Sequence, residues 1–163
     1  MLTIEGSSRA AGFRFAIVVS KYNDFVTERL QAGALAALAA AGVTSEAIAV
    51  VRVPGAFEIP IAAQHAAEGG RYDAVVCLGC VVRGETPHFE YLASAVANGL
   101  TTASAVTGVP ITFGVLTTNS VEEALARAGE GPGNKGYEAA AAAIEMVSVV
   151  AQLTRQVTEP REP

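Results

Sequence analysis

Continuous apolar runs alternate along the chain with longer segments whose apolar residues recur at helical spacing. The runs are rich in Val and Ile, as strands covered on both faces are, and they lie at 13–19, 47–53, 74–82 and 111–118. The longer segments consist mainly of helix-forming residues and lie at 25–42, 57–70, 88–106, 120–129 and 137–157.

Strands that alternate with helices in this way indicate a parallel sheet with helices on both of its faces. We therefore expect an α/β fold of the flavodoxin-like type, a three-layer α/β/α sandwich around a four-stranded parallel sheet. A chain of 163 residues suits one domain. We expect that domain to span 1–163, with an N-terminal extension at 1–12 and a C-terminal tail at 158–163.

The composition narrows the classes of partner. Lys and Arg number 11 against 16 Asp and Glu, and the basic residues are dispersed, so no basic stripe suggests nucleic acid. The run at 13–19 is too short to cross a bilayer and lacks the features of a secretory signal, so we expect a cytoplasmic protein without membrane contact. Hydrophobic residues make up 51% of the chain, which favours buried subunit interfaces and hence a homo-oligomer.

Cys77 and Cys80 form a C-x-x-C pattern, which occurs in redox pairs and in halves of metal sites. Both lie in the apolar run 74–82, and residues three apart on a strand point to opposite faces of the sheet. The chain has no further cysteine to complete a metal site. The pattern therefore favours two buried, reduced thiols and no metal.

Open parallel sheets bind ligands at the carboxyl ends of their strands, where the loops lead into helix N-termini. The segments that follow the four expected strands are SKYNDF (20–25), VPGAFE (53–58), RGETPH (83–88) and TTNS (117–120). All four look unusual for plain connections. This edge of the sheet is therefore where we expect the functional residues.

The segment RGETPH combines a candidate anion site with a candidate proton carrier. If Thr86 caps the next helix and Pro87 is its first residue, the amides from Gly84 to Thr86 converge at a helix N-terminus, which suits a phosphate. His88 then lies one residue inside the helix, and an imidazole exchanges protons near neutral pH. The alternative is a capped surface helix with an incidental histidine.

Other candidates each have a structural alternative. Ala56 and Phe57 could present amides at a helix start, and Glu58 could accept hydrogen bonds from hydroxyls or simply complement the helix dipole. Tyr22 and Phe113 could stack on a planar heterocycle or serve only in packing.

Arg127 could pair with a phosphate, although an arginine late in a helix also favours the dipole and solvent. The glycine-rich GEGPGNKG (129–136) lacks the Ser or Thr that follows Gly-Lys in a Walker loop. No G-x-G-x-x-G follows the first expected strand, which argues against a dinucleotide-binding domain. We therefore interpret 129–136 as a turn between helices.

Five segments together resemble the 6,7-dimethyl-8-ribityllumazine synthase family of riboflavin biosynthesis. They are YNDF, VPGAFEIP, LGCVVRGETPHFEY, FGVLTTNSVEEALARAG and NKGYEAA, in this order between about residues 13 and 150. The resemblance implies a transferase that condenses two small molecules, 5-amino-6-(D-ribitylamino)uracil and 3,4-dihydroxy-2-butanone 4-phosphate. The product would be 6,7-dimethyl-8-ribityllumazine, with release of phosphate and water and with no metal or organic cofactor.

The resemblance also implies roles for individual residues, and His88 would be the residue that transfers protons. The ribitylaminouracil would contact Tyr22, Ala56, Phe57, Glu58, Cys80, Val81, Val82 and Phe113. Glu58 would bind the ribityl hydroxyls, and Phe113 would come from a neighbouring subunit. The butanone phosphate would contact Glu85, Thr86 and Arg127, and Lys135 is an additional candidate.

The chain departs from the usual family residues at three of these positions. Tyr22 stands where Phe or Trp is common, which keeps a ring for stacking and adds a hydroxyl. Glu85 places a negative charge beside the expected phosphate site, so we expect its side chain to point away. Cys80 replaces an aliphatic residue or Thr, with little expected consequence.

The family's active sites lie between the subunits of a pentamer, and in some members twelve pentamers close into a sixty-subunit shell. The turn 129–136 is short, as in shell-forming relatives, so we expect a shell rather than a free pentamer. Riboflavin synthase is a candidate partner within such a shell. Two other interpretations are a flavodoxin-like flavin-binding module and a shell protein without catalytic activity.

Overall fold

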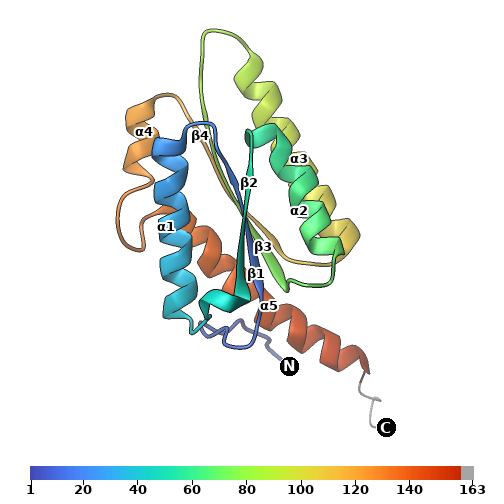
Figure 1. The fold of residues 1–163 in the computed structure, drawn as a ribbon. Helices are drawn as coiled ribbons and strands as arrows, with labels where there is room; N and C mark the ends of the chain where they lie inside the picture. Colours follow the sequence, from blue (N-terminus) through green and yellow to red (C-terminus); the bar gives the residue numbers. More distant parts are fainter. Residues whose placement is uncertain (159–163) are drawn as a thin grey trace.

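The computed structural model describes residues 1–158, which fold around one four-stranded sheet (Figure 1). The strands are parallel and lie in the order β2-β1-β3-β4. Their bounds are Phe15–Ser20 for β1, Ile48–Val53 for β2, Ala74–Val82 for β3 and Ile111–Thr118 for β4. The predicted parallel sheet is therefore confirmed, whereas the predicted tail lies, from residue 159 onward, outside the described residues.

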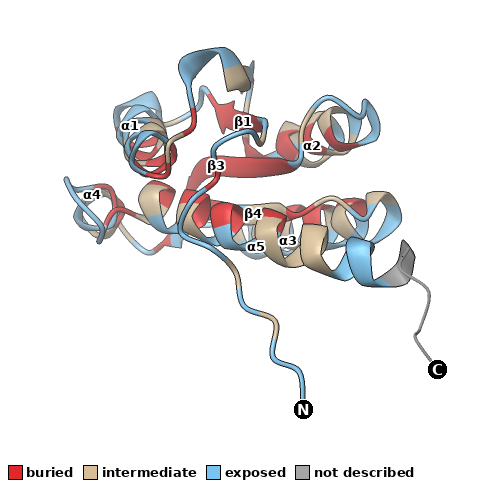
Figure 2. Ribbon diagram, turned by 90° about the horizontal axis from the view of Figure 1, so that it is seen from below, coloured by how far each residue is buried: buried red, intermediate tan, exposed pale blue. Residues whose placement is uncertain are grey.

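Helices cover both faces of this sheet. One face carries α1 and α5 with α4 beside them, and the other carries α2 and α3 (Figure 2). The helices span Asp24–Ala40 (α1), Ile59–Glu68 (α2), His88–Thr107 (α3), Val121–Ala126 (α4) and Lys135–Thr158 (α5), and short 3₁₀ turns span Ser45–Ala47 (η1) and Ala56–Glu58 (η2). The predicted three-layer sandwich is confirmed.

The central strand β3 shows why the sheet needs cover on both faces. Its first eight residues are buried, and its side chains enter the two apolar cores alternately. Cys77 faces the α2–α3 core and Cys80 the α1–α5 core, so the two free thiols lie on opposite faces, as predicted. Burial raises the pKa of both thiols, that of Cys80 to about 11. Both therefore stay protonated at neutral pH and pack as small apolar side chains.

The start of α3 at residue 88 agrees with the expected helical segment, but the predicted cap does not. Pro87, predicted to be the first helical residue, instead precedes the helix, because its ψ of 3° lies outside the helical range. Helix α3 begins at His88, and no side chain within the described residues caps it. The predicted Thr86 cap is therefore wrong, and no side-chain hydrogen bond caps the helix at Pro87.

A network of hydrogen bonds fixes the start of α5. Asn134 is 3% exposed, and its side-chain amide donates to the carbonyls of Arg29 at 3.0 Å and Gly129 at 2.8 Å. Its Oδ1 accepts from the amides of Gly136 at 2.8 Å and Tyr137 at 3.1 Å. These bonds cap α5 and fasten it to α1.

Gly136 lets α5 lie directly against the backbone of α1. A Cβ atom at this position would lie 1.9 Å from the Leu30 carbonyl oxygen. We expect Gly136→Ala to lower the free energy of unfolding by about 3 kcal/mol, since the two helices must separate. Urea unfolding at one fixed protein concentration measures this change.

Gly133→Ala is the matched control for this prediction. A Cβ at Gly133 meets nothing within 4 Å, so the free energy of unfolding is expected to change by less than about 0.5 kcal/mol. Equal losses of stability in the two variants would contradict close packing at Gly136.

Candidate active site

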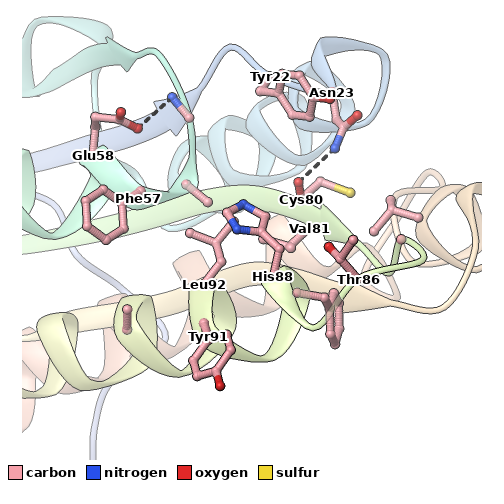
Figure 3. A pocket seen from close by; sticks show the side chains of 16 residues that line it. Tyr22, Asn23, Phe57, Glu58, Cys80, Val81, Thr86, His88, Tyr91 and Leu92 are labelled. Carbon is pink, nitrogen blue, oxygen red and sulfur yellow. Dashed lines mark hydrogen bonds between the residues drawn. The ribbon is translucent and has the colours of Figure 1, made fainter.

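A cavity of about 770 Å³ lies at the carboxyl edge of the sheet, where the loops after β1, β2 and β3 meet α3 (Figure 3). Its lining includes nine residues that the sequence singled out: Tyr22, Ala56, Phe57, Glu58, Cys80, Val81, Val82, Thr86 and His88. The fold thus brings together residues from segments that are far apart in the chain.

The loop after β1 is held against the ends of neighbouring strands. The Tyr22 amide donates to the Pro54 carbonyl at 3.0 Å. Asn23 has a left-handed backbone with φ 60°, and its side chain donates to the Cys80 carbonyl at 2.9 Å. These bonds place the Tyr22 ring at the cavity while leaving it 73% exposed.

The loop after β2 brings a carboxylate and a second aromatic ring to the cavity. Glu58 is half-buried, and its Oε2 accepts a hydrogen bond from the Gly55 amide at 3.1 Å. This bond belongs to the cap of η2, so Glu58 has a structural role as well as a place on the cavity wall. Phe57 is 68% exposed, and such a ring gains from being covered by an apolar ligand or partner.

The loop after β3 ends at His88, the exposed first residue of α3. Figure 3 shows its imidazole directed into the cavity. Helix α3 has 20 residues, and its N-terminus carries a partial positive charge that favours an anion. An accessible imidazole beside an anion site is able to exchange protons with a bound ligand.

Some lining residues were not predicted, and these are Asn23, Phe89, Tyr91, Leu92 and Ala95. Leu92 and Ala95 follow His88 at spacings of four and seven. Residues at these spacings lie on the same face of a helix, so the sequence could have predicted that they line the cavity with His88. Asn23 offers no such signal, because its hydrogen bond joins residues 57 apart in sequence.

Three predicted residues line a different cavity of about 380 Å³, beside β4 and against α5: Phe113, Arg127 and Lys135. The Arg127 guanidinium donates to the Glu123 carbonyl at 3.1 Å, and Lys135 pairs with Glu138 at 2.8 Å. The predicted residues therefore fall into two groups within one chain, and His88 and Arg127 belong to different groups.

Charge is distributed unevenly between the two cavities. The described lining of the larger cavity includes no Lys or Arg, and Glu85 is exposed and lines neither cavity. Within residues 1–158, no group of three or more His, Cys, Asp and Glu side chains is arranged to hold a metal ion. No helix in the same range is long and apolar enough to span a membrane.

Known proteins are similar to this chain over most of its length. The family model of 6,7-dimethyl-8-ribityllumazine synthase matches residues 12–151. A 6,7-dimethyl-8-ribityllumazine synthase of Desulfatibacillum aliphaticivorans is 49% identical over 149 residues, which cover 91% of this chain and 96% of the relative. One of Syntrophus aciditrophicus (strain SB) is 52% identical over 149 residues, covering 91% and 97%. The resemblance seen in the motifs is confirmed, and the chain belongs to the 6,7-dimethyl-8-ribityllumazine synthase family, a family of transferases.

Proposed function

We propose that this enzyme condenses 5-amino-6-(D-ribitylamino)uracil with 3,4-dihydroxy-2-butanone 4-phosphate to 6,7-dimethyl-8-ribityllumazine, releasing phosphate and water. Membership of the family assigns the chain to riboflavin biosynthesis. The observation that carries the proposal is the larger cavity, which joins aromatic, carboxylate and imidazole groups from three loops. Its volume of about 770 Å³ suits a small-molecule ligand.

The ribitylaminouracil fits the region formed by the loops after β1 and β2. The exposed rings of Tyr22 and Phe57 offer faces for stacking on the pyrimidine. One Glu58 oxygen accepts from the Gly55 amide, and the other is available to the ribityl hydroxyls. The apolar wall of this region consists of Ala56, Cys80, Val81 and Val82.

The butanone phosphate fits the N-terminus of α3. Thr86 lines the cavity there, and no side chain of the described residues caps the helix. The helix dipole and the backbone amides at the start of α3 both favour a phosphate at this point. Glu85 contributes its backbone in this arrangement, since its exposed carboxylate would repel the anion.

His88 is the proton carrier in this proposal. Formation of the imine, elimination of phosphate and closure of the ring each require a proton to move, and the imidazole reaches the cavity where both substrates would lie. Holding two reactants in one cavity also supplies part of the acceleration. The proposed reaction uses no metal and no organic cofactor.

A bound phosphate is stabilised by a nearby Lys or Arg side chain, and the described lining of the larger cavity includes neither. Arg127 and Lys135 lie in the second cavity with Phe113, which is 49% exposed on the edge strand β4. In this proposal a neighbouring copy of the chain brings its second cavity against the first, so each active site is completed across a subunit contact.

Repetition of that contact around a ring gives the pentamer expected from the family. The turn between α4 and α5 is short, and the Lys135 amide donates to the Arg127 carbonyl at 2.9 Å across its base. A compact turn supports closure of pentamers into a sixty-subunit shell. Riboflavin synthase is the proposed partner of that shell, and the cytoplasm is its proposed location.

The proposed reaction has a direct optical test. Purified protein mixed with both substrates is expected to form the fluorescent lumazine at the same rate with and without an excess of chelator. Activity that chelation abolishes and a metal restores would contradict the proposed chemistry. A protein that instead purifies with bound flavin and forms no lumazine would support the flavin-binding alternative.

A mixing experiment tests the division of the active site between subunits. His88→Ala is expected to lower kcat by about 10²–10⁴-fold, whereas Arg127→Ala chiefly raises the KM for the butanone phosphate. Unfolded together in equal amounts, refolded and assayed at a butanone phosphate concentration far below the raised KM, the two variants are expected to regain about one quarter of wild-type activity. The reason is that random assembly gives one site in four both intact residues.

Two controls accompany the mixing experiment. The folded variants mixed without unfolding should show no regain. His65→Ala, which changes the other histidine, at an exposed position in α2, should leave the rate unchanged. If the co-refolded mixture is no more active than its components, His88 and Arg127 act within one subunit and the shared site is wrong.

Light scattering tests the assembly. We expect a particle of about sixty chain masses, because the short turn leaves room for contacts between pentamers. A particle of about five chain masses across salt and pH conditions would rule out the shell. A monomer would also rule out the shared active site.

A further inference from the structure

Arg83, the first residue after β3, connects several parts of the structure around the candidate site. Its Nε donates to Asn119 Oδ1 at 2.9 Å, and its NH1 forms an ion pair with the Glu90 carboxylate. The guanidinium also lies over the Phe89 ring, 4.5 Å from the ring centroid. The backbone amide of Arg83 donates to the Thr118 carbonyl at 2.8 Å. Both the backbone and the side chain of this residue are therefore fixed.

These contacts close the loop that leads to His88. Arg83 stands before the loop Gly84–Pro87, and its partners Phe89 and Glu90 directly follow His88 in α3. His88 thus lies between Pro87, the last residue of the loop, and Phe89 and Glu90, which both contact the Arg83 guanidinium. Phe89 lines the cavity whereas Arg83 does not, so the guanidinium acts on the cavity through its neighbours.

Apart from the packing of Phe89 and Leu92 against the core, the first turn of α3 has few polar contacts. The helix has no side-chain cap within the described residues, and the amides of Glu90 and Tyr91 donate to the Pro87 carbonyl at 3.2 and 3.4 Å. The first of these bonds lies at the long end of the usual N–H···O range, and the second lies beyond it. Bonds from its own backbone amide and from Arg83 lower the pKa of Glu90, so the ion pair is present at neutral pH.

The arrangement requires the shape of arginine. A planar guanidinium donates to Asn119 and Glu90 from different nitrogens while its flat face covers the Phe89 ring. The two paired side chains are 45% and 51% exposed, and exposed ion pairs contribute little to global stability. The contacts therefore fix geometry more than they stabilise the fold.

We propose that Arg83 is a positioning residue for the reaction, fixing the first turn of α3 so that the His88 imidazole faces the bound substrates. This inference rests on the proposed function of the cavity. The bond to Asn119 extends the effect to the loop after β4, where Ser120 caps α4 by accepting from the Glu123 amide at 3.1 Å. The Arg83 guanidinium thereby connects the start of α3 to the loop before α4, the helix that is followed by Arg127 of the second cavity.

Hydrogen–deuterium exchange tests the positioning without reference to activity. In Arg83→Met, the amides of Glu90 and Tyr91 are expected to exchange about tenfold faster than in the wild type, because the first turn opens more often. Arg52→Met is the matched control. Arg52 lies on the edge strand β2, away from α3, and forms a similarly exposed ion pair with Glu28 at 3.5 Å. The control should leave exchange at the start of α3 unchanged.

Steady-state kinetics of lumazine formation test the catalytic consequence. Arg83→Met is expected to lower kcat by about 10²-fold, the scale of a displacement of about 1 Å at a reacting group, while the assembled mass stays the same. In a His88→Ala background the same substitution is expected to lower kcat by less than about threefold, because the group that it positions is absent. The kcat of Arg83→Lys should fall between those of the wild type and Arg83→Met. Lysine keeps the positive charge but lacks the planar guanidinium that bonds two partners at once.

The outcomes separate this inference from the proposed function. Unchanged exchange, unchanged kcat, or an equal fold-loss with and without His88 would each overturn the role of Arg83 in an active enzyme. If Arg83→Met does not assemble, Glu90→Gln and Arg83→Lys decide by the same two measurements. A wild-type protein that forms no lumazine would refute the proposed function and the catalytic role together. The exchange data would still decide whether Arg83 holds α3.

Discussion

The burial of β3 on both faces is the constraint on which the rest of the structure depends. A parallel strand in the middle of a sheet leaves no room for polar side chains, so β3 is apolar from Ala74 to Val82. At Gly79 even a Cβ would meet three neighbouring side chains at 3.0 to 3.3 Å. Polar chemistry begins only where the strand ends, at Arg83. Because the four strands are parallel, their carboxyl ends lie at the same edge of the sheet, and the polar residues that follow them gather there.

The same sheet order separates the two cavities. β3 lies inside the sheet, so the cavity at its end is walled by loops on one side and by α3 on the other. β4 lies at the edge, and the second cavity opens beside it. The larger cavity carries Glu58 and no Lys or Arg among its described lining residues, whereas the smaller one carries Arg127 and Lys135, the latter paired with Glu138. Arg127 is therefore the cation without a carboxylate partner among the described contacts of the second cavity, and the larger cavity has no Lys or Arg of its own.

The sequence predicts the structure best where one physical requirement decides the outcome. β3 and β4 have their predicted bounds, because a continuous apolar run that ends in polar residues specifies a buried strand. The cap of α3 was predicted wrongly, with Pro87 inside the helix, since the arrangement depends on the ψ angle of Pro87. The second cavity and the contacts of Arg83 were not predicted. The bond from Arg83 to Asn119 joins residues 36 apart, and only the packing of two loops brings them together.

The turn before α5 is closed at its base. The Lys135 amide bonds to the Arg127 carbonyl, and Asn134 joins Gly129 to the start of the helix. The four residues at 130–133 protrude from this base and are all exposed. The bonds across the base join residues on either side of 130–133 and involve none of the side chains at these four positions. The side chains at the tip of the turn are therefore free to vary without loss of the hydrogen bonds that hold Arg127 and Lys135 together.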